Sequence, residues 1–295
     1  MMIPKEIIQK IRRVQITTSR KVTDVFAGQY QSVFKGLGIE FEEVREYIPG
    51  DDIRSIDWNV TARIGHPYIK KFVEERELTI MILLDVSMSS MFGTRARMKS
   101  NLAAEFCSVM AFSAIKNNDK VGMITFSDRI ENFIPPRKGT KHVLRVIRET
   151  LYNKPIGKGT DINCVLEYFS RVTKRSAITF LVSDFISPDF SKLLNVTNKR
   201  HDIIAVTVTD PMELELASSG IISMRDAETG DRAIIDTASS GIRAHYRATI
   251  QKKIIERDKM FKSAGVDRID IITNKSYVEP LKLFFKTRAR RIARG

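Results

Sequence analysis

Five short, almost continuous apolar runs, separated by helical stretches, limit this chain to few folds. A strand that is buried on both faces of a parallel sheet has no solvent side, so its residues need not alternate between apolar and polar. Strands that alternate with helices predict an α/β fold, a doubly wound and mostly parallel sheet of the Rossmann type with helices on both faces. The runs cover 78–85, 121–127, 177–184, 202–208 and 266–273, and the helical stretches cover 97–117, 140–153, 161–173, 188–199, 240–264 and 276–288.

The rest of the chain divides into smaller segments. Apolar residues at helical spacing predict a helical segment over 1–29. Strand-like stretches separated by turn residues predict a small β-rich subdomain over 30–77. The α/β domain is expected over 78–288, with a β-hairpin inserted at 221–236, where two strand-like runs flank a glycine-containing turn.

The net charge of +14 is concentrated near the C-terminus. Residues 241–295 carry 15 Lys and Arg against 5 Asp and Glu, a net +10, whereas 1–77 and 78–240 carry +1 and +3. We expect a solvated helix face followed by a basic tail at 289–295. Binding of nucleic acid, an acidic protein or anionic lipid through this basic region is the alternative that the charge leaves open.

Several features predict a cytoplasmic protein. No apolar run approaches the length that crosses a bilayer, and the first residues lack the apolar segment of a signal peptide. Cys107 and Cys164 lie in apolar, helical surroundings without the spacing of metal ligands, so we expect both to be reduced.

Oxygen-bearing side chains follow the first apolar run. Asp85 ends this run, and Ser87 and Ser89 come directly after it, in the sequence LLDVSMSS. Ligands of open α/β sheets bind beyond the carboxyl ends of the strands, where these three residues are expected. A carboxylate with two hydroxyls is a hard-oxygen set that suits Mg²⁺ or Mn²⁺ and not Zn²⁺.

Two later loops carry further oxygen ligands to the same edge. Thr160 precedes a predicted helix after a glycine-rich turn, and Asp184 ends another apolar run. Asp161 is better explained as the cap of the helix that begins near it, so it is left out of the ligand set. The predicted metal ligands are therefore Asp85, Ser87, Ser89, Thr160 and Asp184.

The order Asp-x-Ser-x-Ser, then Thr, then Asp resembles the metal-ion-dependent adhesion site of von Willebrand factor A domains. The resemblance implies a von Willebrand factor A-like fold in which some ligands bind the cation through water. It also implies an open coordination position that accepts a carboxylate from a partner protein, without catalysis.

A second resemblance lies in REYIPGDDIRSIDWNVTARIGHPYIKKFVEERE, which is similar to the signature of the domain of unknown function fifty-eight family. Its members are typically encoded beside MoxR-type AAA+ ATPases. The resemblance therefore implies a chaperone-like adaptor that works with such an ATPase in the maturation or assembly of other proteins. The matching residues are Arg45, Tyr47, Gly50, Asp51, Arg54, Asp57, Trp58, Thr61, Ala62 and Arg63.

The residues leave two other functions open. A metal-dependent hydrolase or nuclease could use Asp85 and Asp184, but two-metal chemistry needs further carboxylates where this chain has hydroxyls. A nucleic-acid binder could use the sequence KTRARRIARG, which lacks interleaved aromatic residues. No phosphate-binding loop, Gly-x-Ser-x-Gly or His-Glu-x-x-His motif occurs, so no enzymatic activity is predicted.

Overall fold

The fold is taken from a computed structural model of the chain. The structure describes residues 28–30, 33–34, 43–50, 53, 56, 58–71, 77–93, 97–153, 155–226, 228 and 230–293. Most of the helical segment predicted over 1–29 therefore lies outside the described residues.

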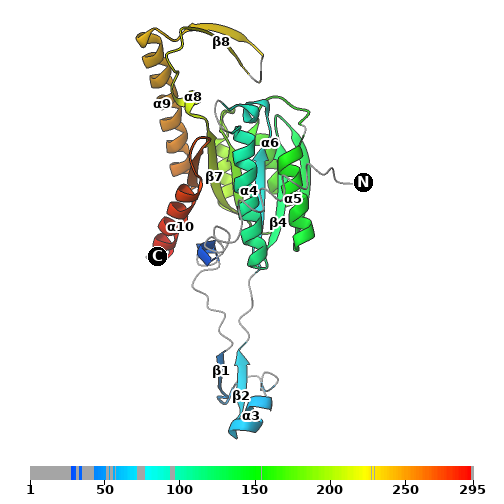
Figure 1. Cartoon of the computed structure of the whole chain (residues 1–295). Coiled ribbons are helices and arrows are strands. Elements are labelled where there is room, and N and C mark those ends of the chain that lie inside the picture. Colours follow the sequence, from blue (N-terminus) through cyan, green and yellow to red (C-terminus); the bar gives the residue numbers. More distant parts are fainter. Residues whose placement is uncertain are drawn as a thin grey trace.

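A six-stranded sheet forms the centre of the molecule (Figure 1). Its strands lie in the order β10-β7-β6-β3-β4-β5, and every neighbouring pair is parallel except β4 and β5. The predicted α/β fold with a doubly wound, mostly parallel sheet is confirmed. The strands are β3 (Thr79–Asp85), β4 (Lys120–Phe126), β5 (Ile130–Arg137), β6 (Ile178–Ser183), β7 (Asp202–Thr209) and β10 (Asp267–Ile272).

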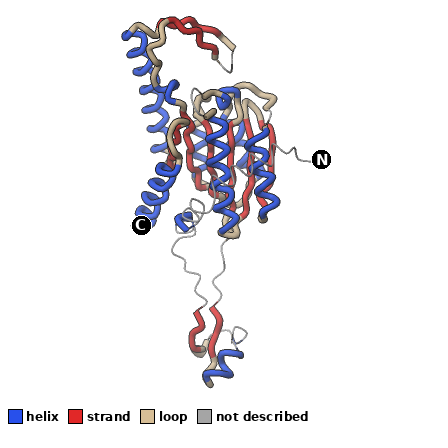
Figure 2. Tube along the Cα trace, viewed as in Figure 1, coloured by secondary structure: helices blue, strands red, loops and turns tan. Residues whose placement is uncertain are grey.

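Helices cover both faces of this sheet, as the blue and red tubes of Figure 2 show. One face packs against α4 (Lys99–Lys116), α5 (Thr140–Tyr152) and α10 (Val278–Ile292). The other face packs against α6 (Ile162–Val172), α7 (Ser191–Asn198) and α9 (Ser240–Ser263). The short α8 (Pro211–Leu214) follows β7.

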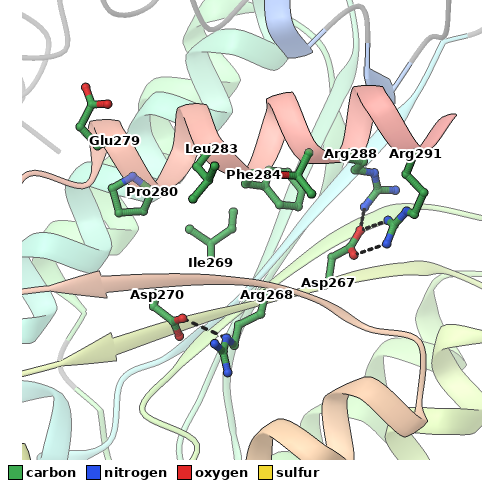
Figure 3. Close-up of a pocket in the computed structure, with 11 residues that line it drawn as sticks. Asp267, Arg268, Ile269, Asp270, Glu279, Pro280, Leu283, Phe284, Arg288 and Arg291 are labelled. Carbon is green, nitrogen blue, oxygen red and sulfur yellow. Dashed lines mark hydrogen bonds and ion pairs between the residues drawn. The ribbon is translucent and has the colours of Figure 1, made fainter. Parts of the chain in front are cut away.

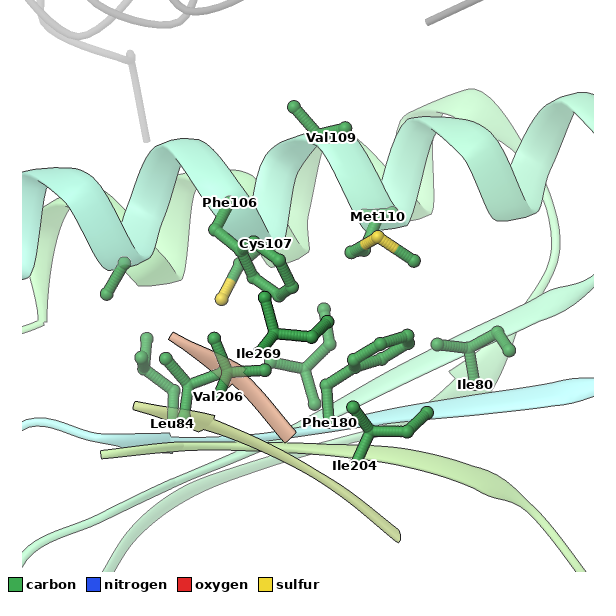
Figure 4. Close-up of a cluster of buried hydrophobic side chains, with 14 of the residues drawn as sticks. Ile80, Leu84, Phe106, Cys107, Val109, Met110, Phe180, Ile204, Val206 and Ile269 are labelled. Atoms are coloured by element: carbon green, nitrogen blue, oxygen red, sulfur yellow. The ribbon is translucent and has the colours of Figure 1, made fainter. Parts of the chain in front are cut away.

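Alternate residues of β3 fill the two halves of the core. Ile80 and Ile82 point to the α4 side, whereas Met81 and Leu83 point to the α6 side, and all four are fully buried. On the α4 side, the side chains of the helix lie directly over those of the sheet (Figure 4). Burial on both faces explains why the strand has no polar alternation.

The strand β5 was not predicted from the sequence. It is antiparallel, forms one edge of the sheet and is mostly half-buried. Its sequence contains Pro135 and Pro136, which weaken a strand prediction because proline donates no ladder hydrogen bond. An edge position tolerates both prolines.

The segment before the sheet is divided differently from the prediction. The described residues contain β1 (Glu43–Glu46), α3 (Trp58–Ile64) and β2 (Tyr68–Lys71), and β1 pairs antiparallel with β2. Tyr30 and Phe34, however, pack into the α4 side of the main core. Trp58, among the residues that carry the family resemblance, is 67% exposed.

Two C-terminal features complete the description. The predicted hairpin at 221–236 is present as the antiparallel pair β8 (Ile221–Arg225) and β9 (Arg232–Asp236). The basic tail predicted at 289–295 begins inside α10, which continues to Ile292. Within the described residues, no helix combines the length and apolar character needed to cross a membrane.

Candidate metal centre

Two neighbouring strands bring the first candidate ligands together. β3 and β6 run parallel, with Leu84 opposite Val182, so their carboxyl ends meet at one edge of the sheet. Asp85 is the last residue of β3, and Asp184 directly follows β6. The alternation of strands and helices thus places two carboxylates from distant parts of the sequence side by side.

The carboxylate of Asp85 is held in a fixed orientation. Oδ1 accepts a hydrogen bond of 2.9 Å from the backbone N–H of Ser87, and Oδ2 accepts one of 2.6 Å from the Ser183 hydroxyl. Asp85 is only 5% exposed. Burial raises its pKa to about 6, and the charge of Asp184 adds to this rise, although hydrogen bonds from Ser183 and Ser87 oppose it. A nearby cation would favour the charged form.

The two serines join Asp85 to Asp184. The Oγ atoms of Ser87 and Ser89 lie 3.0 Å apart, and the Ser89 hydroxyl donates a hydrogen bond of 2.8 Å to Asp184 Oδ2. A 3₁₀ turn, η2 (Met88–Met91), carries Ser89, and the Ser90 hydroxyl fixes it by donating to the Ser87 carbonyl. Four of the five predicted ligands therefore form one hydrogen-bonded chain.

The chain reverses sharply after Asp184. Phe185 has a positive φ of 60°, a left-handed conformation that is rare for a bulky residue. Its backbone N–H donates to the Ser183 hydroxyl, and the N–H of Ile186 donates to Asp184 Oδ1. These contacts fix the direction of the Asp184 carboxylate, and such backbone strain is typical of functional sites.

The loop before Thr160 is tied to the first serine loop. The Glu131 carboxylate accepts hydrogen bonds from the backbone N–H groups of Ile156 and Gly157, and the Lys158 carbonyl accepts one of 3.1 Å from Met88 N–H. A Cβ atom on Gly157 would lie 2.2 Å from the Ser127 Oγ, so a larger residue there would have to displace the Ser127 side chain.

Thr160 itself contacts a residue outside the predicted set. Its hydroxyl donates a hydrogen bond of 2.9 Å to Oε1 of Glu228, which lies in the turn between β8 and β9. The charge of Asp184 acts on the same carboxylate and raises the pKa of Glu228, after the larger effect of burial. Asp161 caps α6 by accepting from Asn163 N–H, as predicted.

A buried lysine at the site escaped the sequence analysis. The Lys99 ammonium, at the start of α4, lies 2.8 Å from Asp184 Oδ2 and 2.6 Å from Glu213 Oε1, and the side chain is 2% exposed. Burial lowers the pKa of Lys99, but the two carboxylates outweigh it and raise the pKa overall. Of Lys99 and Glu213, only Glu213 has a local sequence signal, because it forms a capping box with Asp210.

The donors at this edge fit a hard divalent cation. Adjacent oxygens around Mg²⁺ lie about 3.0 Å apart, because each lies about 2.1 Å from the ion. The Ser87–Ser89 oxygen pair and the Thr160–Glu228 oxygen pair have separations of 3.0 and 2.9 Å. Within the described ranges, no three His, Cys, Asp or Glu side chains form a metal-binding group, so a cation here would depend on the hydroxyls.

Two cavities are lined by residues that the structure describes. A cavity of about 10 Å³, lined in part by Asp85, Ser89, Lys99 and Asp184, has room for about one water molecule. A larger groove of about 740 Å³ lies between β10 and α10, where Arg288 and Arg291 pair with Asp267 (Figure 3). None of the predicted ligands lines this groove.

Comparisons with known proteins find a similar sequence over nearly the whole chain and solved structures that are similar over part of it. An uncharacterized protein of Mycobacterium tuberculosis strain H37Rv is 28% identical over 290 residues, which is 95% of this chain and 89% of that protein. The conserved hypothetical protein BatB from Bacteroides thetaiotaomicron has 17% identity and a TM-score of 0.45, covering 74% of this chain and 100% of that chain. An aerotolerance-related membrane protein from Bacteroides fragilis has 15% identity and a TM-score of 0.49, covering 72% and 99%.

The sequence also matches a protein family over residues 43–255, a stretch that begins with β1 and ends within α9. This match covers well over half of the chain and confirms the family expected from the residues around Trp58. The chain belongs to the family described as "Protein of unknown function DUF58".

Proposed function

We propose that this protein is a non-catalytic module that binds another protein through a divalent cation, Mg²⁺ or Mn²⁺. Its ligands would be Asp85, Ser87, Ser89, Thr160 and Asp184. The observation that carries the proposal is the hydrogen-bonded chain from Asp85 through Ser87 and Ser89 to Asp184, at the carboxyl ends of two adjacent strands. Ligands of open α/β sheets bind at this kind of edge.

The hydroxyl-rich donor set favours binding over hydrolysis. Hydroxyls leave more positive charge on the cation than carboxylates do, so the ion keeps its attraction for an external acidic group. Asp184 Oδ2 is already shared by Ser89 and Lys99, which suits a carboxylate that acts on the ion through water. A partner's Asp or Glu would then fill the remaining position.

The resemblance to the domain of unknown function fifty-eight family supplies a partner class. We propose that the cation-bound site takes part in an assembly with a MoxR-type AAA+ ATPase. In that assembly the protein would act as an adaptor or co-chaperone in protein maturation. If the assembly uses ATP, the ATPase would hydrolyse it.

Isothermal titration with Mg²⁺ and Mn²⁺ tests the cation site. We expect saturable binding to the wild type and its loss in Asp85→Ala, because this carboxylate anchors the first serine loop. Glu256→Ala on the exposed side of α9 removes a carboxylate elsewhere and is the matched control. Absence of saturable heat, or equal binding by Asp85→Ala, would contradict the proposal.

A pull-down with and without EDTA tests the binding function. We expect the wild type, but not Asp85→Ala, to retain a AAA+ ATPase only when the divalent cation is present. Mn²⁺-dependent cleavage of DNA or RNA that disappears in Asp184→Ala would instead assign a hydrolase. Retention of the ATPase in EDTA would show that the ATPase binds without the metal site.

A further inference from the structure

The turn between β8 and β9 extends to the edge of the sheet that carries the candidate ligands. Figure 1 shows the hairpin extending from the start of α9 over the upper end of the sheet. The contact is specific, because Glu228 Oε1 accepts the Thr160 hydroxyl at 2.9 Å. A Cβ atom on Gly159 would lie 3.5 Å from the other carboxylate oxygen, so the Thr160 loop runs directly beside Glu228.

The hairpin is anchored firmly at its base and weakly along its length. Thr237 is fully buried, accepts from Ser219 N–H and donates to the Gly220 carbonyl. Along the strands, Ile221 and Ile234 are 75% and 79% exposed. A two-stranded hairpin with little burial is marginally stable by itself. The contact of Glu228 with Thr160 therefore helps to hold the turn over the site.

The position of Glu228 matches that of a ligand. Its Oε1 accepts a hydrogen bond of 2.9 Å from the Thr160 hydroxyl, so a cation bound by Thr160 lies within reach of this carboxylate. Its backbone N–H donates to Asp226 Oδ1, which orients the side chain within the turn.

We propose that Glu228 is an internal ligand, whose carboxylate takes the coordination position that an acidic side chain of the partner takes in the complex. The partner then binds by exchanging one carboxylate for another, and the β8–β9 hairpin moves away from the Thr160 loop. This inference rests on the proposed cation-dependent function. It defines the partner's contribution as an Asp or Glu side chain that competes with Glu228.

Mn²⁺ binding to the full chain tests this assignment with Glu228→Gln and Glu228→Ala. We expect both variants to bind Mn²⁺ about tenfold or more weakly than the wild type, because a ligand is lost. Water-proton relaxation by the bound Mn²⁺ rises in Glu228→Ala, since water replaces the carboxylate. Glu256→Gln removes a carboxylate from α9 and changes neither quantity.

Trypsin cleavage after Arg225 and Arg232 reports on the hairpin independently of affinity, because both residues are exposed. Saturating Mn²⁺ slows cleavage of the wild type, whereas Glu228→Ala is cleaved at the same rate with and without Mn²⁺. Glu228 is not a ligand if the wild type and both Glu228 variants have the same affinity for Mn²⁺, the same water-proton relaxation and the same cleavage rate. If Asp85→Ala then fails to bind Mn²⁺, the proposed cation site is still supported. If the wild type binds no Mn²⁺, the proposed function fails and takes this inference with it.

Discussion

The buried lysine at the candidate site leads to a sharp stability prediction. The Lys99 ammonium pairs with Asp184 and Glu213, whose side chains are 6% and 25% exposed. Lys99→Met keeps most of the side-chain volume but leaves both carboxylates without this cation. Removing one partner of a buried ion pair costs about 3–5 kcal/mol, because the remaining charge stays desolvated.

The loss is measurable by thermal or urea unfolding in the presence of a chelator. For a domain of this size, about 3–5 kcal/mol corresponds to a fall in Tm of roughly 6–20 °C. Mn²⁺ at about a hundred times its Kd stabilises a folded protein by about 2.7 kcal/mol. It stabilises Lys99→Met more than the wild type, since the ion supplies the missing counter-charge to Asp184. The difference in Tm between the wild type and Lys99→Met is therefore smaller in Mn²⁺ than in chelator.

Lys282→Met is the matched control, because the Lys282 side chain is 44% exposed and its partner Glu279 is 77% exposed. We expect this substitution to change the free energy of unfolding by about 0.5 kcal/mol or less. Wild-type stability of Lys99→Met in chelator would refute the role of the buried pair. If Mn²⁺ leaves the difference in Tm between the wild type and Lys99→Met unchanged, the cation does not replace the charge of Lys99 beside Asp184.

Three further outcomes follow from the structure. Burial and then the charge of Arg200 lower the pKa of His201 to about 4, so its contribution to stability is complete above its ordinary pKa of 6.5 and is lost as the pH falls toward 4; lowering the pH from about 7.5 to 5 should therefore reduce the free energy of unfolding by about 2 kcal/mol more in the wild type than in His201→Leu. Gly157→Ala forces its new Cβ into Ser127 and should weaken Mn²⁺ binding in titration calorimetry, whereas Gly241→Ala, with ordinary contacts, should not. Phe180→Ala creates a cavity in the core on the α4 side and should lower the free energy of urea unfolding by about 3–5 kcal/mol.

The central parallel strands β3, β4, β6 and β7 could be predicted because each is buried on both faces. The runs that contain β3 and β6 are continuous and apolar, and burial is the condition that produces such runs. The strand β5 escaped prediction because an edge strand needs neither continuous apolar residues nor a full set of backbone donors. Its two adjacent prolines also resemble a loop.

The sequence predicts the candidate ligands only where they are neighbours in the sequence or follow a recognisable strand. Asp85, Ser87 and Ser89 are close in sequence, and Asp184 directly follows a strand that the apolar pattern identified. Lys99 and Glu228 reach the site through tertiary packing, from a helix start and from a hairpin turn. Neither residue type is unusual in those places, so no local signal distinguishes them.

The adjacency of β3 and β6 has a consequence for biosynthesis. The hydrogen bond between Ser183 and Asp85 joins residues 98 positions apart, and the one between Ser89 and Asp184 joins residues 95 apart. A ribosome-bound chain that ends before β6 carries the serine loop but has no opposing carboxylate. Tight cation binding would therefore begin only after β6 has paired with β3, so the bound ion would report that these two distant segments have come together.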